Sequence, residues 1–478
     1  MAVIINHFNK TLLSSGYLGV DIFFVISGYV ITSSLSGRES LSLGDFLSGF
    51  YERRIKRLVP ALVVFVMVTS ILICLFNPDP GTALKTGIAS LFGLSNLYLF
   101  RQSTNYFAQS TELNPFTHTW SLGVEEQFYL LFPVLIWISG FGRQAKNGAR
   151  NLFFIIGVLT IVSLSGFIYL YQTNQPAAYF SMPPRFWEMA TGCLTFIGFQ
   201  RRARIEQVLE RIPPFLILTG MLGVMFAPVN MAVPATIAIV LLSAALLASL
   251  KAGTAAFVVF THKRVVYVGL ISYSLYLWHW TVLCISRWTI GVSWWSALPL
   301  MVIVFAFAIA SFELLEKPFR RTVSLRRSST FILGAASIIS STGFVASLGY
   351  PAISKALLIF DGDTSTFQRG RQSQINYIGP ITKRKNSDCG TAAQDLTPLS
   401  IRASLPYCFW EGPLSNRQLP VVAILGDSHA HQLFPISERI AKEMGLSVFN
   451  YQYWGCLVPQ LQGATPDSKC MNVNKVPE

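Results

Sequence analysis

The sequence predicts a polytopic α-helical membrane bundle followed by a smaller extracytoplasmic α/β domain. The chain has 478 residues, of which 52% are hydrophobic and only 13% are charged, whereas soluble proteins are usually about 25% charged. Its mean hydropathy is +0.48. Apolar runs near 20 residues, long enough to cross a bilayer, recur up to about residue 349. Beyond that point the sequence is polar and is broken by Pro and Gly, which is typical of a soluble domain.

We expect about eleven membrane spans from these runs. They are a remnant at 1–8 and then 17–36, 59–76, 121–140, 151–171, 186–200, 214–227, 235–250, 265–286, 294–313 and 330–349. A further crossing at 86–100 would put the basic cluster at Arg143 outside, so we expect 86–100 to be interfacial or re-entrant. The first run reads like the last part of a helix, so we expect the first span to be truncated.

Positive charge sets the orientation of the predicted spans. The net charge is +14, and it gathers in short segments between apolar runs, as in cytoplasmic loops, rather than in a nucleic-acid-binding pattern. The clusters around Arg53, Arg143, Arg201, Lys263 and Arg320 mark these loops. With this count the last span crosses outward, and the C-terminal domain is extracytoplasmic.

Cysteine usage agrees with that placement. Four cysteines, Cys389, Cys408, Cys456 and Cys470, lie in the polar C-terminal part. An even number in an extracytoplasmic domain predicts two disulfides. Pairing Cys389 with Cys408 and Cys456 with Cys470 is the simplest of three possibilities, and the sequence leaves all three open.

Ionisable side chains in membrane spans usually face a cavity or one another. Several lie at the outer ends of predicted spans: His7, Asp21, His118, Glu125, Glu126 and His279. Each has a structural interpretation of its own, as a helix–helix hydrogen-bonding group, a satisfied interior histidine, or an anion at a helix N-terminus. Their joint occurrence at one level favours a shared polar pocket.

The basic run Arg53-Arg-Ile-Lys-Arg-Leu-Val-Pro60 has two interpretations. It can be an ordinary topology determinant. Alternatively, Arg53, Arg54 and Arg57 can bind phosphate at the cytoplasmic face, because the guanidinium fork suits phosphate oxygens.

Four motifs in order resemble the membrane acyltransferase-3 family. They are Gly19-Val-Asp-Ile-Phe-Phe-Val-Ile-Ser-Gly-Tyr-Val-Ile-Thr32, the arginine run at 53–60, His118-Thr-Trp-Ser-Leu-Gly-Val-Glu-Glu-Gln-Phe-Tyr-Leu130 and Ile271-Ser-Tyr-Ser-Leu-Tyr-Leu-Trp-His-Trp280. The resemblance covers roughly 1–349 and implies a bacterial O-acyltransferase that modifies surface polysaccharides. The family's first-helix motif is an Arg, ten residues, then a His. His7 matches that His, and the Arg would precede Met1.

The segment 419–431 carries a candidate nucleophile in the soluble part. An apolar strand ends in Gly426-Asp-Ser428, and a serine at a strand-to-helix turn can be exposed with its amide available to an oxyanion. A plain helix N-cap is the structural alternative. After the acyltransferase motifs, Gly426-Asp-Ser-His429 resembles the SGNH-type domain fused to such enzymes. That family's Asp-x-x-His does not follow Ser428 here, so we expect this domain to be C-terminally incomplete.

The resemblance implies a complete functional assignment. The expected domains are an acyltransferase-3 membrane domain at 1–320, an additional membrane helix at 321–350, an extracytoplasmic extension at 351–418 and a partial SGNH-type domain at 419–478. The enzyme would sit in the bacterial inner membrane and move acetyl from acetyl-CoA to a polysaccharide or lipid-linked sugar, such as lipopolysaccharide O-antigen. Membrane lipids are the other expected partners, and no metal or nucleic acid is expected.

The expected catalytic groups are His7, as general base or transient acyl carrier, with Asp21, His118, Glu125, Glu126 and Ser428. A carboxylate such as Asp21 or Glu125 is expected to orient His7, and Glu125 to lie on its side of the membrane, away from the arginines. The alternatives are a transporter or sensor in which these groups relay protons or bind an exported ligand, and an enzyme whose soluble domain only trims esters.

Overall fold

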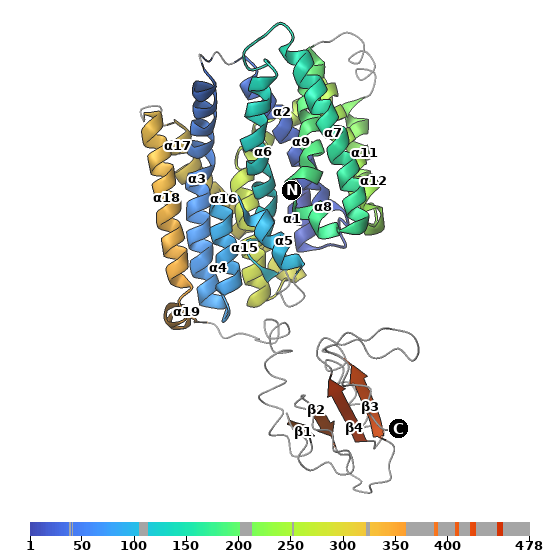
Figure 1. Ribbon diagram of the computed structural model, residues 1–478, viewed down its shortest axis with the longest axis vertical. Coiled ribbons are helices and arrows are strands. Elements are labelled where there is room, and N and C mark those ends of the chain that lie inside the picture. Colours follow the sequence, from blue (N-terminus) through green and yellow to red (C-terminus); the bar gives the residue numbers. More distant parts are fainter. Residues whose placement is uncertain are drawn as a thin grey trace, which may run out of the picture. The chain divides into compact units, whose positions relative to one another are not determined.

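The computed structural model describes residues 1–37, 40, 42–104, 113–200, 213–250, 253–321 and 326–359, and four strands within 387–452. The chain divides into two compact units, Met1–Thr364 and Ser365–Glu478. The first unit is a bundle whose long helices run in roughly the same direction (Figure 1).

The helices of the first unit follow the predicted runs in order. Its first half contains α1 (Ala2–Phe8), η1 (Gly16–Leu18), α2 (Gly19–Leu35), α3 (Leu43–Phe76), α4 (Gly81–Leu91), α5 (Ser95–Ser103), η3 (Thr117–Thr119), α6 (Trp120–Ile138), α7 (Gly148–Thr173), α8 (Gln175–Phe180) and α9 (Met182–Gln200). Its second half contains α11 (Pro214–Met225), η4 (Val229–Met231), α12 (Ala232–Ser249), α13 (Ala255–Thr261), α14 (Lys263–Leu270), α15 (Ser272–Trp288), α16 (Trp294–Ser311), the π-helical turn η5 (Phe312–Glu316), α17 (Lys317–Arg321), α18 (Arg327–Leu348) and α19 (Pro351–Leu357).

Within the described residues, 7 helices are long and apolar enough to cross a membrane, and α14 with α15, bent by 62°, raises this to 8. They coincide with eight of the expected spans. The stretches 1–8, 186–200 and 214–227 form α1, α9 and α11, which do not meet the same criterion. The count of eleven therefore stays a prediction. The segment 86–100 falls on the short helices α4 and α5, neither of which meets the criterion for a crossing.

The arginine run lies within helix α3, and the expected loop at this position is wrong. Ser42 starts the helix by accepting a hydrogen bond from the Asp45 amide at 3.2 Å. The helix then continues for 34 residues, through Pro60, which corresponds to about 51 Å. No glycine or asparagine C-cap interrupts the run from Tyr51 to Leu58. The arginines are thus held on a rigid element that continues directly into the apolar span.

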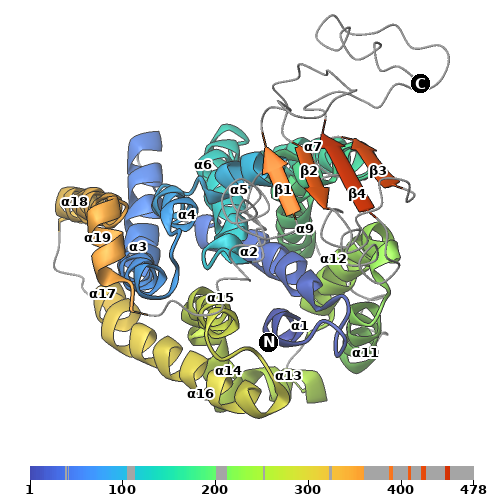
Figure 2. The same cartoon turned by 90° about the horizontal axis from the view of Figure 1, so that it is seen from below.

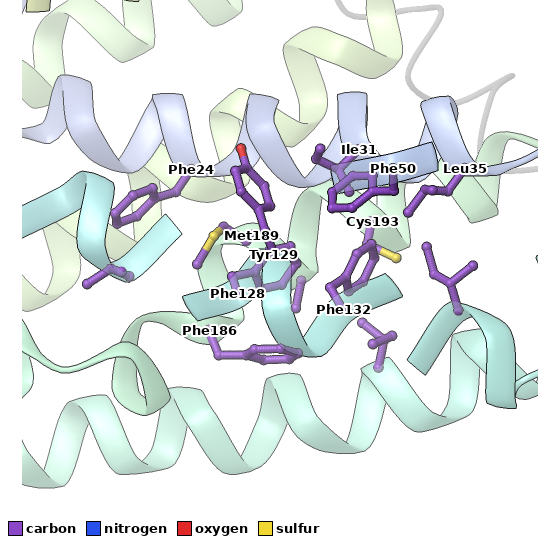
Figure 3. Close-up of a cluster of buried hydrophobic side chains, with 14 of the residues drawn as sticks. Phe24, Ile31, Leu35, Phe50, Phe128, Tyr129, Phe132, Phe186, Met189 and Cys193 are labelled. Carbon is purple, nitrogen blue, oxygen red and sulfur yellow. The ribbon is translucent and has the colours of Figure 1, made fainter. Parts of the chain in front are cut away.

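Aromatic packing between α2, α6 and α9 forms one hydrophobic core cluster of the bundle. Figure 3 shows Phe24, Phe128, Phe132 and Met189 in this cluster. The rings of Phe128 and Phe132 stack with centroids 4.5 Å apart. Between helices in lipid, such dispersion contacts stabilise association more than expulsion of water does.

Two glycines allow α2 and α9 to approach at backbone distance. A Cβ atom on Gly28 would lie 1.9 Å from the Met189 carbonyl oxygen, and one on Gly192 would lie 1.9 Å from the Val25 carbonyl oxygen. Any larger residue would push the helices apart, which is why small residues mark close membrane-helix contacts. This contact places Ser27, the neighbour of Gly28, at a fixed height in the bundle.

The second unit contains a four-stranded mixed sheet of order β1-β2-β4-β3. Its strands are β1 (Ser387–Gly390), β2 (Tyr407–Trp410), β3 (Val421–Gly426) and β4 (Ser447–Gln452). The β1–β2 and β2–β4 pairs are antiparallel, and β3–β4 is parallel. A parallel pair needs a crossover connection of a dozen or more residues, and residues 427–446 supply it. They lie outside the described residues, so the α/β assignment stays a prediction.

The sheet register bears on the predicted disulfide. Cys389 and Cys408 are direct partners across β1 and β2. This is the arrangement that the simplest pairing needs, although the pairing itself stays a prediction. Cys456, Cys470 and Ser428 lie outside the described residues.

Candidate active site

Three histidines from distant parts of the sequence meet inside the bundle. His7 lies in the last turn of α1, His118 lies in η3, and His279 lies in α15. Seen along the bundle, α1 lies between α15 and α2 (Figure 2). The Nδ1 atom of His7 lies 3.0 Å from Nε2 of His279, and their rings are parallel within 4°. The ring centroids of His118 and His279 are 5.4 Å apart.

Helix α15 holds the other two histidines in place. Arg287 donates a hydrogen bond from Nη2 to the His7 carbonyl oxygen at 2.9 Å. This oxygen lies in the last turn of α1, where a positive charge also stabilises the helix dipole. Trp280 packs edge-on against the His7 ring, 4.5 Å between centroids. The Tyr276 hydroxyl donates to the His118 carbonyl oxygen at 2.9 Å. The cluster is therefore fixed by side chains of one helix.

The ring of His118 is deeply buried without hydrogen bonds. Its residue is 3% exposed, and neither ring nitrogen has a hydrogen-bond partner among the residues that the structure describes. The rings of Phe65, Tyr276 and His279 surround it. Leaving such a group unsatisfied costs roughly 1–3 kcal/mol. This is the environment of a group that meets a water molecule or a ligand.

A cavity of about 260 Å³ lies beside the cluster, although none of the three histidines is among the residues that line it. Arg54 and Arg57 of α3 line it, as do Ser121 and Tyr276, which contact each other at 2.7 Å beside His118. Along α6 the lining runs from Ser121 to Tyr129, a rise of about 12 Å. Its remaining walls are mainly apolar side chains of α1, α2 and α15, including Ile4, Val20, Phe23, Ile26 and Leu275. One cavity thus joins a cationic wall to the surroundings of the histidines.

The two glutamates of α6 separate onto different faces. Glu125 lines the cavity, and its Oε1 accepts hydrogen bonds from Ser27 Oγ at 2.5 Å and from the Tyr129 hydroxyl. The guanidinium carbon of Arg54 lies 3.9 Å from the Tyr129 ring centroid. Glu126 is only half-buried and is not among the cavity-lining residues. Glu125 therefore shares a wall with Arg54, and the expectation that it lies with His7, away from the arginines, is wrong.

Asp21 belongs to a separate buried ion cluster. Arg185 Nη1 donates to Asp21 Oδ1 at 2.7 Å and to Glu188 Oε1 at 2.9 Å. The rings of Trp120, Phe167 and Tyr179 surround the guanidinium at 5.3–5.6 Å. The expected contact of Asp21 with His7 is therefore wrong, because Asp21 ties α2 to α9. Sequence reasoning missed Arg185 and Glu188, although charges three residues apart at the start of an expected span were the available signal.

The arginines also differ in position. Arg54 and Arg57 stand three residues apart on one face of α3 and both line the cavity. Arg53 is exposed and does not line it. In the part of the chain that the structure describes, no group of three His, Cys, Asp or Glu side chains is placed to hold a metal ion.

Comparison with known proteins identifies the families to which the two parts of the chain are similar. The model of the acyltransferase domain matches residues 2–313, and the model of the SGNH domain that is fused to acyltransferase-3 domains matches residues 389–476. O-acetyltransferase OatA of Staphylococcus aureus strain NCTC 8325 is 30% identical over 306 residues, which cover 59% of this chain and 48% of OatA. A protein of S. aureus strain COL, provisionally named as an O-acetyltransferase, is 31% identical over 346 residues, which cover 67% of this chain and 55% of that protein.

This chain therefore spans about half the length of these relatives. No solved structure matches it. The acyltransferase model covers well over half of the chain, and it spans the histidine cluster, the cavity and the arginines of α3. The apolar helices agree with a multi-pass membrane protein. We conclude that the chain belongs to the acyltransferase-3 family and carries the SGNH domain found fused to its members.

Proposed function

We propose that the protein is a membrane O-acetyltransferase. It takes acetyl from cytoplasmic acetyl-CoA and delivers it to a hydroxyl of an extracytoplasmic surface polysaccharide, such as lipopolysaccharide O-antigen. The observation that carries this proposal is that Arg54 and Arg57 line the same cavity as Ser121 and Tyr276, the two residues beside His118. The O-acetyltransferase names of the relatives support the acetyl group and the hydroxyl acceptor.

The cationic wall suits the phosphates of the donor. Guanidinium groups bind phosphate through paired hydrogen bonds, and the two arginines project to the same face from a rigid helix. The apolar walls suit the uncharged arm that carries the thioester. With the phosphates at the arginines, the acetyl end of the donor points along α6 toward Ser121 and Tyr276.

The histidine cluster supplies the base for the transfer. The acceptor hydroxyl gives its proton to His7 as its oxygen forms a bond to the thioester carbonyl carbon. The carbon–sulfur bond then breaks, and the CoA thiolate leaves with the electron pair and takes up the proton from His7. His118, whose ring nitrogens have no described partner, donates in this scheme to the carbonyl oxygen as it becomes negative.

The acceptor hydroxyl can belong to the sugar or to an enzyme side chain that hands the acetyl group on. Ser428 follows β3 directly after Asp427 and is the candidate for the second role, as a transient ester. In that case Ser428→Ala in the full-length protein abolishes sugar acetylation, while His7 still activates water as the acceptor, so that CoA and acetate are released at a reduced rate.

Substituting both cavity arginines tests donor binding. We expect Arg54→Gln with Arg57→Gln to raise the KM for acetyl-CoA about 10²- to 10⁴-fold, since each of the two lost charged hydrogen bonds weakens binding by about 1.5–3 kcal/mol. S-acetylpantetheine lacks the phosphates, so its KM is expected to change by less than ~3-fold. Steady-state acetyl transfer by the full-length protein in nanodiscs measures both constants.

Arg143→Gln is the control, because Arg143 is exposed and does not line the cavity. An equal rise of the KM for both donors would mean that the arginines support folding rather than phosphate binding. An unchanged KM for acetyl-CoA in the double variant would contradict the donor site. A transporter or sensor would show no acetyl-CoA turnover at all.

A further inference from the structure

We propose that His279 is a positioning residue that fixes the tautomer of His7 and so leaves Nε2 of His7 as its unprotonated, basic nitrogen. The inference rests on the proposed function. It comes from two contacts that form a chain, from the Tyr276 carbonyl oxygen to His279 and from His279 to His7.

The first contact fixes the proton on His279. Its Nδ1 lies 2.7 Å from the backbone carbonyl oxygen of Tyr276. A carbonyl oxygen can only accept, so Nδ1 of His279 must carry the hydrogen. A positively charged His279 would be a fully buried cation, at 0% exposure, with no carboxylate among its described contacts, which is strongly unfavourable. His279 is therefore neutral, and its Nε2 carries a lone pair.

The second contact transmits this choice to His7. Nε2 of His279 is an acceptor and lies 3.0 Å from Nδ1 of His7. The hydrogen of that contact must come from His7, so neutral His7 is protonated on Nδ1 and basic on Nε2. No described residue donates a hydrogen bond to Nε2 of His7, which leaves that lone pair for an acceptor hydroxyl. The carboxylate that commonly orients a catalytic histidine is here replaced by a second histidine.

The same chain supports the proton-transfer step. When Nε2 of His7 takes the hydroxyl proton, the ring becomes positive, and its Nδ1–H bond to His279 becomes a charge-assisted hydrogen bond. Without His279, the His7 Nδ1–H group would be buried without a partner, or the proton would move to Nε2 and block the base. Removing a group that orients a functional histidine through its second ring nitrogen typically costs about 10- to 100-fold in activity.

Two substitutions separate positioning from folding. His279→Leu removes the acceptor, and we expect the kcat for acetyl transfer to fall about 100-fold, with the KM for acetyl-CoA within ~3-fold of wild type. His279→Gln returns an acceptor oxygen near the position of Nε2, and we expect it to recover activity to within ~10-fold of wild type. A purely structural role predicts equal losses in both variants. Wild-type kcat in the Leu variant, or equal kcat in two folded variants, would overturn the proposal.

A spectroscopic measurement reads the His7 tautomer in the wild-type protein and uses a variant only to assign the signals. In ¹⁵N-histidine-labelled protein in nanodiscs, the His7 signals are those that vanish in His7→Ala. A proton on Nδ1 of His7 supports the proposal, and a proton on Nε2 overturns it. If His7→Ala abolishes acetyl transfer but His279→Leu does not, only this inference fails. If His7→Ala remains fully active, the assignment of His7 as the base of the proposed function fails, and if the wild type transfers no acetyl group, the proposed function itself fails.

Discussion

Replacing His7 with alanine is expected to lower the rate of acetyl transfer by about 10²- to 10⁴-fold, the usual contribution of a positioned general base. The physical reason is that His7 is the histidine whose ring nitrogen remains available at the end of the hydrogen-bond chain through His279. Binding of acetyl-CoA should persist, because Arg54 and Arg57 lie on α3 and are unchanged. Single-turnover acetyl transfer and equilibrium binding of the donor measure the two quantities.

Ile5→Ala is the matched control for His7→Ala. Ile5 lies on the same short helix, is 38% exposed and does not line the cavity, so we expect it to leave the rate nearly unchanged. Added imidazole should partly restore the His7→Ala variant if the lost function is proton transfer. A variant with wild-type acetyl transfer, or one that imidazole cannot restore although it folds and binds donor, would count against His7 as the base.

The second large effect is on stability. Arg185→Met is expected to lower the free energy of unfolding by about 3–5 kcal/mol, because it leaves buried carboxylates with no counter-ion. Asp21 and Glu188 both lose their hydrogen bonds to Nη1 in this variant. Thermal unfolding in detergent, followed by circular dichroism, should show the loss as a lower melting temperature.

Removing the charges together should restore stability. A triple variant with Asp21→Leu, Arg185→Met and Glu188→Met is expected to regain most of the lost free energy, since replacing a whole buried ion cluster by apolar residues of similar volume is often nearly neutral. Arg150→Met is the control, because Arg150 is exposed at the start of α7. An Arg185→Met variant that melts with the wild type would show that the cluster does not hold α2 to α9.

Much of the bundle could be predicted because its signals are local. Apolar runs mark eight of the expected spans, and the level of His7, His118 and His279 along their helices follows from where those runs begin and end. The loop expected around Arg53 became part of α3 because basic residues mark a side of the membrane but do not break a helix.

What failed was the choice of partners. Asp21 pairs with Arg185, 164 residues away, and nothing in either local pattern specifies that contact. Glu125 and Glu126 were taken together, but consecutive helical residues project about 100° apart, so only one faces the cavity. The same geometry separates Arg53 from Arg54 and Arg57. In our proposal His279 takes the orienting role expected of a carboxylate. The sequence put His279 at the same end of its span as His7 but did not predict the contact between them.

The central claim is that acetyl passes through the cavity from the arginine wall to the histidines. Sealed proteoliposomes test it. Labelled acetyl-CoA is present only on the side of the membrane nearer to Arg54, and an oligosaccharide acceptor is present only on the opposite side. Leu122→Trp fills the cavity from α6, and Leu130→Trp, at 63% exposure on the same helix, does not. We predict that wild type and Leu130→Trp label the acceptor and that Leu122→Trp labels it about 100-fold more slowly. Equal labelling by all three proteins would contradict the account.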